Sequence, residues 1–405
     1  MSASTLDPST APTASTTPTW AVGSPRLLAG LDRYGSLDHT THLATHGPLP
    51  STDRTRLTAL LDAVALAGRG GAGFPFATKV RATPDHGTVI VNGSESEPAS
   101  LKDRTLLRRA PHLVLDGAVA VAAATRAKRI TVAVHDDAAA AAVRRAISER
   151  RDCRRVRIEL VGGGFVAGEA RAVRRALDGG RPVPPGRRVH LTQGGTLLSN
   201  VETFAQVAVA LRLGPHRFRD TGTHAEPGTT LLTVGGAVAH PGVVEVPLGT
   251  PLGIVLSAAG AGIPQAVVIG GYHGTWIAPQ LNTQLSHATG LGAGVISVVD
   301  GSTCALGELA RVTAWLAAQS AQQCGPCRFG LPALARDVAA IARGGDSTAA
   351  LHHARAVDGR GACHHPDGTA RFVTSGLHVL RDEIERHQTR GGCGRPTLGQ
   401  LAVPA

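Results

Sequence analysis

The chain has 405 residues and a formal net charge of +11 at pH 7, so it is long enough for two or three domains with separate cores and basic enough to favour acidic partners. Its arginines are scattered, and no dense basic run carries interleaved aromatic residues, which argues against nucleic-acid binding. No apolar run approaches the roughly 20 residues that cross a bilayer, and no signal peptide is evident, so we expect a cytoplasmic protein with reduced cysteines.

Residues 1–50 are expected to be a disordered tail followed by a lead-in. Ser, Thr, Ala and Pro dominate residues 2–19, a composition that buries too little apolar surface to order the chain. The stretch RLLAGLDRYGSLDHTTHL that follows is mixed, and we expect it to form a short helix that packs on the next domain.

Residues 51–225 show the alternation typical of an α/β domain. Helical spacing in RTRLTALLDAVALA precedes three β-rich segments, and Ala-rich helical segments separate these from one another. Strands that alternate with helices predict a parallel sheet. The expected strands are residues 87–93, 129–136 and 156–164, and the expected helices are 111–127, 138–151 and a last one that ends near Leu213.

Two smaller regions follow. Residues 226–300 contain short β-rich segments, a turn and one helical segment, which indicates a small α+β domain. Residues 301–390 are expected to form a helical bundle, with helices at 306–321, 328–343 and 369–388, and residues 391–405 a tail. The expected fold class is therefore α/β, with a Rossmann-like parallel-sheet domain followed by an α+β domain and a helical bundle.

The stretch GRGGAGFPFATK, residues 68–79, fits the dinucleotide fingerprint G-x-G-x-x-G in its first six residues. That fingerprint requires a strand before the glycines and a helix after them, whereas here a helix precedes and Pro75 follows the last glycine closely. A Walker phosphate loop is also excluded, because Lys79 is not preceded by glycine. The stretch is then either a glycine-rich turn or the loop of another cofactor.

Three further segments favour a cofactor. VNGSESEPASLKDR (91–104), GGGFVAGEARA (162–172) and LLSNVETF (197–204) each follow or end an apolar segment and carry polar or acidic residues. Open parallel sheets bind ligands at the carboxyl ends of their strands. Together with the glycine-rich loop, these segments suit a large planar cofactor with a polar tail.

In this order and spacing, the motifs GRGGAGFP…K, VN…ExEPxxxKDR, GGFxxGEA and NVETFA resemble those of the NADH-oxidising flavoprotein subunit of respiratory complex I, the NADH:quinone oxidoreductase 51 kDa-type family. Diaphorase subunits of bacterial hydrogenases and formate dehydrogenases share the pattern. The resemblance covers roughly residues 55–388. It implies that residues 226–300 form a ubiquitin-like SLBB domain and that the helical bundle carries an iron–sulfur cluster.

The resemblance implies that the cofactor is FMN. Backbone N–H groups and a cation suit a dianionic phosphate, so the glycine-rich loop and Lys79 are expected at the phosphate. Ser94 departs from the family pattern, which has an aspartate there, so one acceptor for the ribityl chain is weaker. The expected FMN-binding residues are Gly68, Arg69, Gly70, Lys79, Asn92, Ser94, Glu95, Gly168, Glu169, Ser199 and Asn200.

The same resemblance implies that NADH stacks over the flavin, with Phe74 and Glu97 as contacts. Other family contacts are missing. Where the family has a second acidic residue this chain has Ala170, and where the family has Lys-Pro-Pro-Phe this chain has VPPG at 183–186. A lost stacking ring costs about 1 kcal/mol, and a lost charged hydrogen bond about 1.5–3 kcal/mol. The adjacent Arg187 and Arg188 are expected to compensate for the lost lysine.

Cys324 and Cys327 form a CxxC pair, and with the later Cys363 they suit a [4Fe–4S] cluster. The family has a further cysteine where this chain has Ala321, so three of four ligands are present. Three interpretations stay open. The site holds a cluster with a non-cysteine or solvent ligand beside His364 and His365, or zinc bound by the cysteines and one of these histidines, or it is vestigial.

The other cysteines are not expected to complete this site. A helix over residues 306–321 would place Cys304 about 25 Å from the CxxC pair. Cys393 follows a helix that leads away from Cys363, so Cys304 and Cys393 could meet at the far end of the bundle. Cys153, in an arginine-rich segment, is expected to be incidental.

These features predict an NADH dehydrogenase (diaphorase)-type oxidoreductase in which FMN accepts two electrons from NAD(P)H and passes them singly to a [4Fe–4S] cluster. The next carrier is expected to be an acidic ferredoxin-like or iron–sulfur protein, or a membrane reductase complex that holds the chain at the inner membrane face. Hydride transfer needs no side-chain acid or base. Two other hypotheses are an FMN relay fed by a protein donor and a non-redox scaffold with a Cys/His zinc site.

Overall fold

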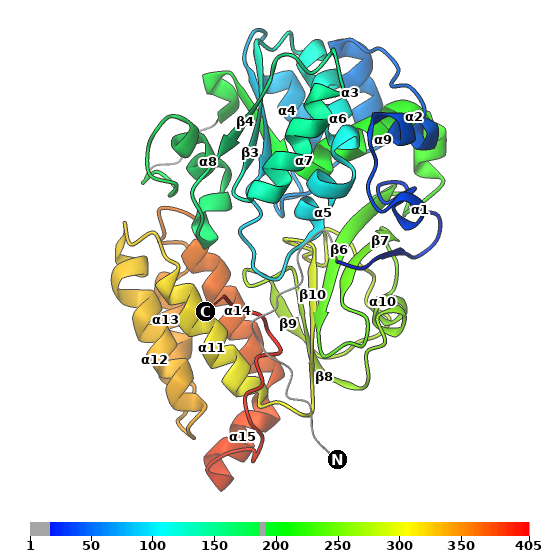
Figure 1. Cartoon of the computed structure of the whole chain (residues 1–405). Helices are drawn as coiled ribbons and strands as arrows, with labels where there is room; N and C mark the ends of the chain where they lie inside the picture. The colour runs from blue at the N-terminus through cyan, green and yellow to red at the C-terminus, as the bar shows by residue number, and fades with distance from the viewer. Residues whose placement is uncertain (1–16, 187–190, 405) are drawn as a thin grey trace.

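A four-stranded parallel sheet lies at the centre of the first region, in a computed structural model that describes residues 17–186 and 191–404 (Figure 1). The strand order is β4-β3-β2-β5, so β2 is central and its carboxyl end lies beside that of β5. The strands are β2 (Thr88–Gly93), β3 (Arg129–Val134), β4 (Val156–Leu160) and β5 (Thr196–Asn200). The sequence predicted the first three and missed β5, whose five residues run directly into a helix.

Helices cover this sheet. The long α6 and α9 pack so closely that a Cβ at Gly117 would lie 1.8 Å from the backbone oxygen of Phe204. The last helix bends at Gly214, where φ is 69°, close to the end predicted from the sequence. The helices are α3 (Arg54–Ala63), α4 (Phe76–Ala82), α5 (Lys102–Arg109), α6 (Pro111–Ala124), α7 (Asp137–Ser148), α8 (Ala170–Leu177) and α9 (Val201–Arg219), with short 3-10 turns η1 (Phe165–Gly168) and η2 (Leu191–Gly194).

A second, mixed sheet has the order β1-β7-β6-β10-β8-β9. Its central strand β10 runs parallel to β6 and antiparallel to β8, which agrees with the predicted α+β character of this region. The ubiquitin-like assignment stays a prediction. The elements are β1 (Thr19–Ala21), β6 (Thr229–Gly236), β7 (Gly242–Pro247), α10 (Leu252–Ala258), β8 (Pro264–Ile269), β9 (Thr275–Ile277) and β10 (Val295–Asp300).

The lead-in is more ordered than expected at its start. Thr19, placed in the disordered tail by composition, lies in β1, which pairs with β7 in parallel. Two short helices follow, α1 (Leu31–Tyr34) and α2 (His39–His46), where one was expected. Glu245 of β7 is buried and accepts hydrogen bonds from the backbone of Leu27 and Leu28, which anchors the lead-in.

The C-terminal region is a helical bundle with one more helix than predicted, α13, and a break at Leu380 that divides the last predicted helix. The segment expected as a tail packs on the bundle: Leu401 is buried, and the hydroxyl of Tyr272 donates to the backbone oxygen of Ala402 at 2.6 Å. The elements are α11 (Ala305–Ala318), a π-helical turn η3 (Pro326–Gly330), α12 (Leu331–Ile341), α13 (Thr348–Val357), α14 (His365–Val379) and α15 (Arg381–Arg390). None of the helices described is long and apolar enough to cross a membrane.

Candidate functional site

A cleft of about 590 Å³ lies where the carboxyl ends of β2 and β5 face the second sheet and the start of α14. Its size suits one cofactor with part of a second ligand. Apart from Arg187 and Arg188, which lie outside the described residues, the cleft brings together the residues proposed from the sequence for FMN and NADH, with one of the proposed cluster ligands. These lining residues are Gly68, Arg69, Gly70, Phe74, Lys79, Asn92, Ser94, Glu95, Glu97, Gly168, Glu169, Ser199, Asn200 and Cys363.

The glycine-rich loop forms one wall of the cleft. An isolated bridge between Ala67 and Pro75 closes the loop, and the Gly68 N–H donates to the backbone oxygen of Phe74 at 2.9 Å. Gly71 has φ of 97°, a left-handed conformation that side chains other than glycine rarely adopt. A Cβ at Gly70 would lie 3.4 Å from that of Asn200, so the loop backbone passes directly over the end of β5.

Lys79 projects from α4 beneath this loop. Its Nζ donates to the backbone oxygen of Leu198 at 3.0 Å, and burial lowers its pKa. Among the residues that the structure describes, it has no carboxylate partner. Because a half-buried ammonium without a counter-charge is costly, an anion at this end of the cleft would satisfy it.

Arg69 lines the cleft, but its side chain is also engaged within the protein. The side chain is buried, contacts the ring of His287 and donates to the backbone oxygen of Thr229 at 3.3 Å. Its Nε lies 3.9 Å from Glu202. Arg69 therefore joins the α/β region to the second sheet.

Asn92 connects the end of β2 to the GGFxxGEA loop. Its Nδ2 donates to the backbone oxygen of Gly168 at 2.9 Å, and its Oδ1 accepts from the Ser94 N–H at 3.1 Å. A Cβ at Gly168 would lie 2.3 Å from Ser96 Oγ and 2.6 Å from the backbone oxygen of Ser94. Glycine is thus required at 168 for the two loops to meet.

Two of the acids proposed to contact FMN are occupied within the protein. Glu95 accepts from Ser100 at 2.6 Å and from both the backbone and side chain of Arg104. Although burial acts to raise it, Arg104 and these hydrogen bonds lower the pKa of Glu95. Glu169 caps α8 and pairs with Arg171 at 2.8 Å. Both acids hold the cleft wall in place and have little capacity left for a ligand.

Glu97 is less well paired. One carboxylate oxygen accepts from the Tyr272 N–H at 2.8 Å and the other from the Ala99 N–H at 3.4 Å. Burial raises the pKa of Glu97 to about 7. Phe74, which lines the cleft, exposes 48% of its surface.

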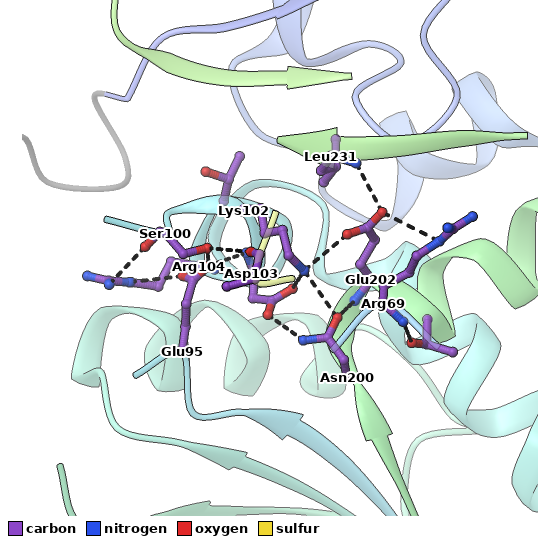
Figure 2. A network of polar contacts seen from close by, with 12 residues as sticks. Arg69, Glu95, Ser100, Lys102, Asp103, Arg104, Asn200, Glu202 and Leu231 are labelled. Atoms are coloured by element: carbon purple, nitrogen blue, oxygen red, sulfur yellow. Dashed lines mark hydrogen bonds and ion pairs between the residues drawn. The ribbon is translucent and has the colours of Figure 1, made fainter. Parts of the chain in front are cut away.

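A buried polar network around Lys102, which itself lines the cleft, was not recognised from the sequence (Figure 2). Lys102 Nζ contacts Asp103, Asn200 and Glu202 at 2.9, 3.3 and 3.0 Å, and Glu202 accepts from the backbone of Leu231. Although burial opposes it, Asp103 and Glu202 raise the pKa of Lys102. The sequence did contain a signal for this network: a Lys-Asp pair follows the acidic residues of ESEP at the start of a helix. The network holds Asn200, which also caps α9, in position.

The three proposed cluster ligands lie in two neighbouring connections. Cys324 precedes η3, Cys327 lies within it, and Cys363 lies two residues before the start of α14. Burial, Cys324 and Cys363 together raise the pKa of Cys327 to about 12. Cys363 also lines the cleft, so the cysteine site and the proposed flavin site share a wall.

Neither neighbouring histidine completes a zinc site there. His365 is buried with both ring nitrogens engaged, one by His273 at 2.9 Å and the other by the backbone oxygen of Leu316 at 2.9 Å. His364 is exposed at the cleft, and its Nδ1 lies 3.0 Å from Asp367. Among the described residues, the three thiols do not form a tight ligand group with a histidine. By contrast Cys304 and Cys393 do meet at the far end of the bundle, as the helix lengths allowed.

The segment VPPG offers little to a nicotinamide ligand. Pro184 lines the cleft, and its backbone oxygen accepts from the side chain of Gln323 at 2.7 Å, which ties this segment to the CxxC loop. Phe74 and Phe165 supply the phenyl rings of the described cleft wall. The proposed compensating residues Arg187 and Arg188 lie outside the described residues.

Comparison with known proteins agrees with this geometry. The family model of the Nuo51 FMN-binding domain matches residues 61–209, and that of the NADH-ubiquinone oxidoreductase-F iron-sulfur binding region matches residues 307–387. The NADH-quinone oxidoreductase-F protein of Streptomyces coelicolor is 30% identical over 376 residues, which cover 83% of this chain and 84% of the relative. The chain belongs to the NADH-quinone oxidoreductase-F family.

Other members and a solved structure extend the match. The NADH-quinone oxidoreductase-F protein of Escherichia coli (strain K12) is 26% identical over 409 residues, covering 91% of this chain and 92% of the relative. The crystal structure of an NAD+-reducing [NiFe]-hydrogenase in the H2-reduced state superposes with a TM-score of 0.81 at 27% identity, covering 93% of this chain and 68% of that chain. The predicted family and fold class are thus confirmed.

Membership in the NADH-quinone oxidoreductase-F family makes the chain an NADH dehydrogenase-type oxidoreductase component with FMN and a [4Fe–4S] cluster as cofactors and NADH as substrate. The described residues fit both cofactors. Lys79 is a half-buried cation without a counter-charge beside a glycine loop, and the cysteine connections lie in the region matched by the iron–sulfur model. These matches favour a cluster over zinc at the CxxC loop.

Proposed function

We propose that FMN lies in the cleft with its phosphate at Lys79 and the glycine loop. The loop backbone at Gly70 and Gly71 and the Lys79 ammonium supply N–H donors and positive charge at one end. The ribityl chain and ring extend along the ends of β2 and β5, past Asn92, Ser94, Gly168, Ser199 and Asn200. Ser94 and Ser199 offer hydroxyls that can donate or accept as the ribityl chain requires.

Bound FMN supplies the conversion of a two-electron donor into one-electron steps. The protein positions the nicotinamide: Phe74 offers a ring face at the mouth of the cleft, and Glu97 offers a carboxyl group at its wall. With a pKa near neutrality, Glu97 can present either a donor or an acceptor to a ribose or amide. Neither residue exchanges a proton with the hydride carbon.

One observation carries the proposal that electrons pass directly to a cluster: Cys363 belongs to the wall of the same cleft as Asn92 and Asn200. A cluster held by Cys324, Cys327 and Cys363 therefore lies next to the flavin. Its fourth iron has no cysteine, because position 321 is alanine. Since both ring nitrogens of His365 are engaged and His364 forms no close ligand group with the thiols among the described residues, we assign a solvent-derived ligand to this iron.

The next carrier is proposed to be an acidic iron–sulfur protein that docks beside η3. Phe329, two residues after Cys327, is 73% exposed there, and the Arg328 guanidinium lies over its ring. An exposed aromatic ring beside a cation is typical of an interface anchor. The net charge of +11 favours encounter with an acidic partner, either a free ferredoxin-like protein or a component of a membrane-attached reductase.

The test is an absorbance spectrum of protein purified anaerobically, before and after addition of NADH, with iron assayed in the same sample. We expect flavin bands and broad iron–sulfur absorbance, both bleached by NADH. Bands that bleach with dithionite and not with NADH would overturn NADH oxidation and indicate a relay fed by a protein donor. A colourless protein prepared under these conditions would overturn both redox assignments.

A further inference from the structure

A second group of metal-ligand side chains lies at the opposite end of the helical bundle from the CxxC loop. The ligand atoms of Cys304, Glu383, His387 and Cys393 all lie within 4.8 Å of one another. They come from three separate segments: the N-cap of α11, helix α15 and the C-terminal segment that follows it. Cys304, Glu383 and His387 are buried, and Cys393 is half-buried.

The spacing fits one metal ion. Zinc binds thiolate sulfur at about 2.3 Å and imidazole nitrogen at about 2.0 Å in a tetrahedron, which places the two ligand atoms about 3.5 Å apart. Cys304 Sγ and His387 Nε2 are 3.5 Å apart. In a [4Fe–4S] cluster the cysteines bind different irons, so their sulfurs stand farther apart than thiolates on a single ion.

His387 is oriented as a ligand. Its Nδ1 lies 2.7 Å from the backbone oxygen of Ala342, so Nδ1 carries the proton and donates it there. This fixes the tautomer that leaves the Nε2 lone pair directed toward Cys304. A metal-bound histidine typically donates its other N–H to a carbonyl or carboxylate in this way.

The surroundings suit two thiolates and one carboxylate. The Gly307 N–H donates to Cys304 Sγ at 3.2 Å, at the positive end of α11. Arg395 and Gln265 hold Glu383 by one oxygen, while its other oxygen has only a long contact, 3.4 Å, from the Leu306 N–H. Glu383 is therefore the weakest of the four ligands, and the two cysteines and the histidine form the strong set.

This group is separate from the iron–sulfur site. The family match to the iron–sulfur region spans residues 307–387, which excludes Cys304 and Cys393. Helix α11, with 14 residues, spans about 21 Å and leads from Cys304 toward the CxxC loop. A metal ion bound at one end of the bundle therefore shares no protein side chain with a cluster bound at the other end.

We propose that Cys304, His387, Cys393 and Glu383 bind one zinc ion as a closed, structural site. Two soft thiolates, one imidazole and one carboxylate in a tetrahedron are a zinc ligand set with no open position for substrate. The ion ties the C-terminal segment to the first turn of α11, where Cys304 N–H already donates to the Pro396 oxygen at 2.7 Å. Binding releases the thiol protons of the two cysteines.

The first experiment needs no variant. Protein purified without chelators is assayed for zinc and iron, and zinc-edge X-ray absorption is recorded. We expect about one zinc per chain, with two sulfurs near 2.3 Å and nitrogen or oxygen near 2.0 Å. Absence of zinc after growth in zinc-replete medium would overturn the proposal. So would a Cys304–Cys393 disulfide found by mass spectrometry of anaerobically alkylated protein.

A pair of variants then assigns the site. Cys393→Ser, at a half-buried position, is expected to lose at least 90% of the zinc and to retain its iron. The matched variant Cys324→Ser is expected to lose iron and retain zinc. Loss of iron from Cys393→Ser with Cys324→Ser unaffected would show that the cluster occupies this end of the bundle and would refute the zinc site. If Cys393→Ser is recovered unfolded, the absorption spectrum of the unmodified protein still decides the outcome.

Discussion

Lys102 Nζ lies 3.0 Å from Glu202 Oε2, and both side chains are almost completely buried. The other oxygen of Glu202 accepts from the Leu231 N–H at 3.0 Å (Figure 2). One carboxylate thus links the first turns of α5 and α9 to the second sheet. One wall of the cleft proposed to hold FMN depends on this junction between two regions of the chain.

Removing the cation should destabilise this junction. In Lys102→Met, the buried Asp103 and Glu202 lose their common partner, and breaking a buried pair in this way costs about 3–5 kcal/mol. We expect a lower melting temperature of the purified protein, measured by circular dichroism. Lys128→Met, at an exposed position, is the matched control and should change stability by less than about 0.5 kcal/mol. Equal melting of Lys102→Met and wild type would contradict the buried pair.

Lys79→Met should selectively weaken the binding of FMN. A lost charged hydrogen bond costs about 1.5–3 kcal/mol, which corresponds to about 10- to 150-fold weaker binding. Fluorescence titration of flavin-free protein measures the affinity. Riboflavin, which lacks the phosphate, should bind the variant and wild type alike, and Lys128→Met should bind FMN normally. An equal loss for both flavins would place Lys79 at the ring and not at the phosphate.

Gly168→Ala should disturb the loop contact beside the flavin. The added Cβ would meet Ser96 Oγ at 2.3 Å and the backbone oxygen of Ser94 at 2.6 Å, and the backbone contact cannot be relieved by a rotamer change. We expect a fall in the FMN retained per chain after gel filtration. Gly163→Ala adds the same methyl group in the same loop where no atom lies within 4 Å, and it should retain FMN as the wild type does. Full retention by Gly168→Ala would show that the loops do not meet as described.

Glu97 should make stability depend on pH. Burial raises its pKa from an ordinary value of 4.5 to about 7, so the folded protein binds a proton that the unfolded chain has already released between these values. The unfolding free energy therefore falls as pH rises from about 4.5 to 7, by about 3 kcal/mol in total. Glu97→Gln should remove this pH-dependent contribution to the unfolding free energy and so reduce the drop in melting temperature between pH 5.5 and pH 8. Glu159→Gln, at an exposed carboxyl, should leave the drop unchanged. If the melting temperature of Glu97→Gln dropped as much as that of the wild type, Glu97 would be ionised in the folded protein throughout this pH range.

The sequence was sufficient to identify the family, three of the four parallel strands and the segments that line the cleft. The reason is local: a glycine loop, a polar strand end and a CxxC turn are each defined by neighbouring residues, and their order along the chain identifies the family. Helix length allowed Cys304 and Cys393 to meet, and the structure shows that they do. Strand β5 was missed because its five residues, TLLSN, include only two apolar ones and run directly into a helix.

The roles of charged side chains depended on the tertiary structure. In sequence, Arg69, Glu95 and Glu97 appear equally available to a ligand. Packing directs Arg69 into the joint with the second sheet, satisfies Glu95 at the start of α5 and leaves Glu97 with two backbone contacts. Whether a charge serves the fold or a ligand depends on the partners that distant segments bring to it, because burial without a partner is costly. Composition and spacing do not contain that information, and the folded chain supplies it.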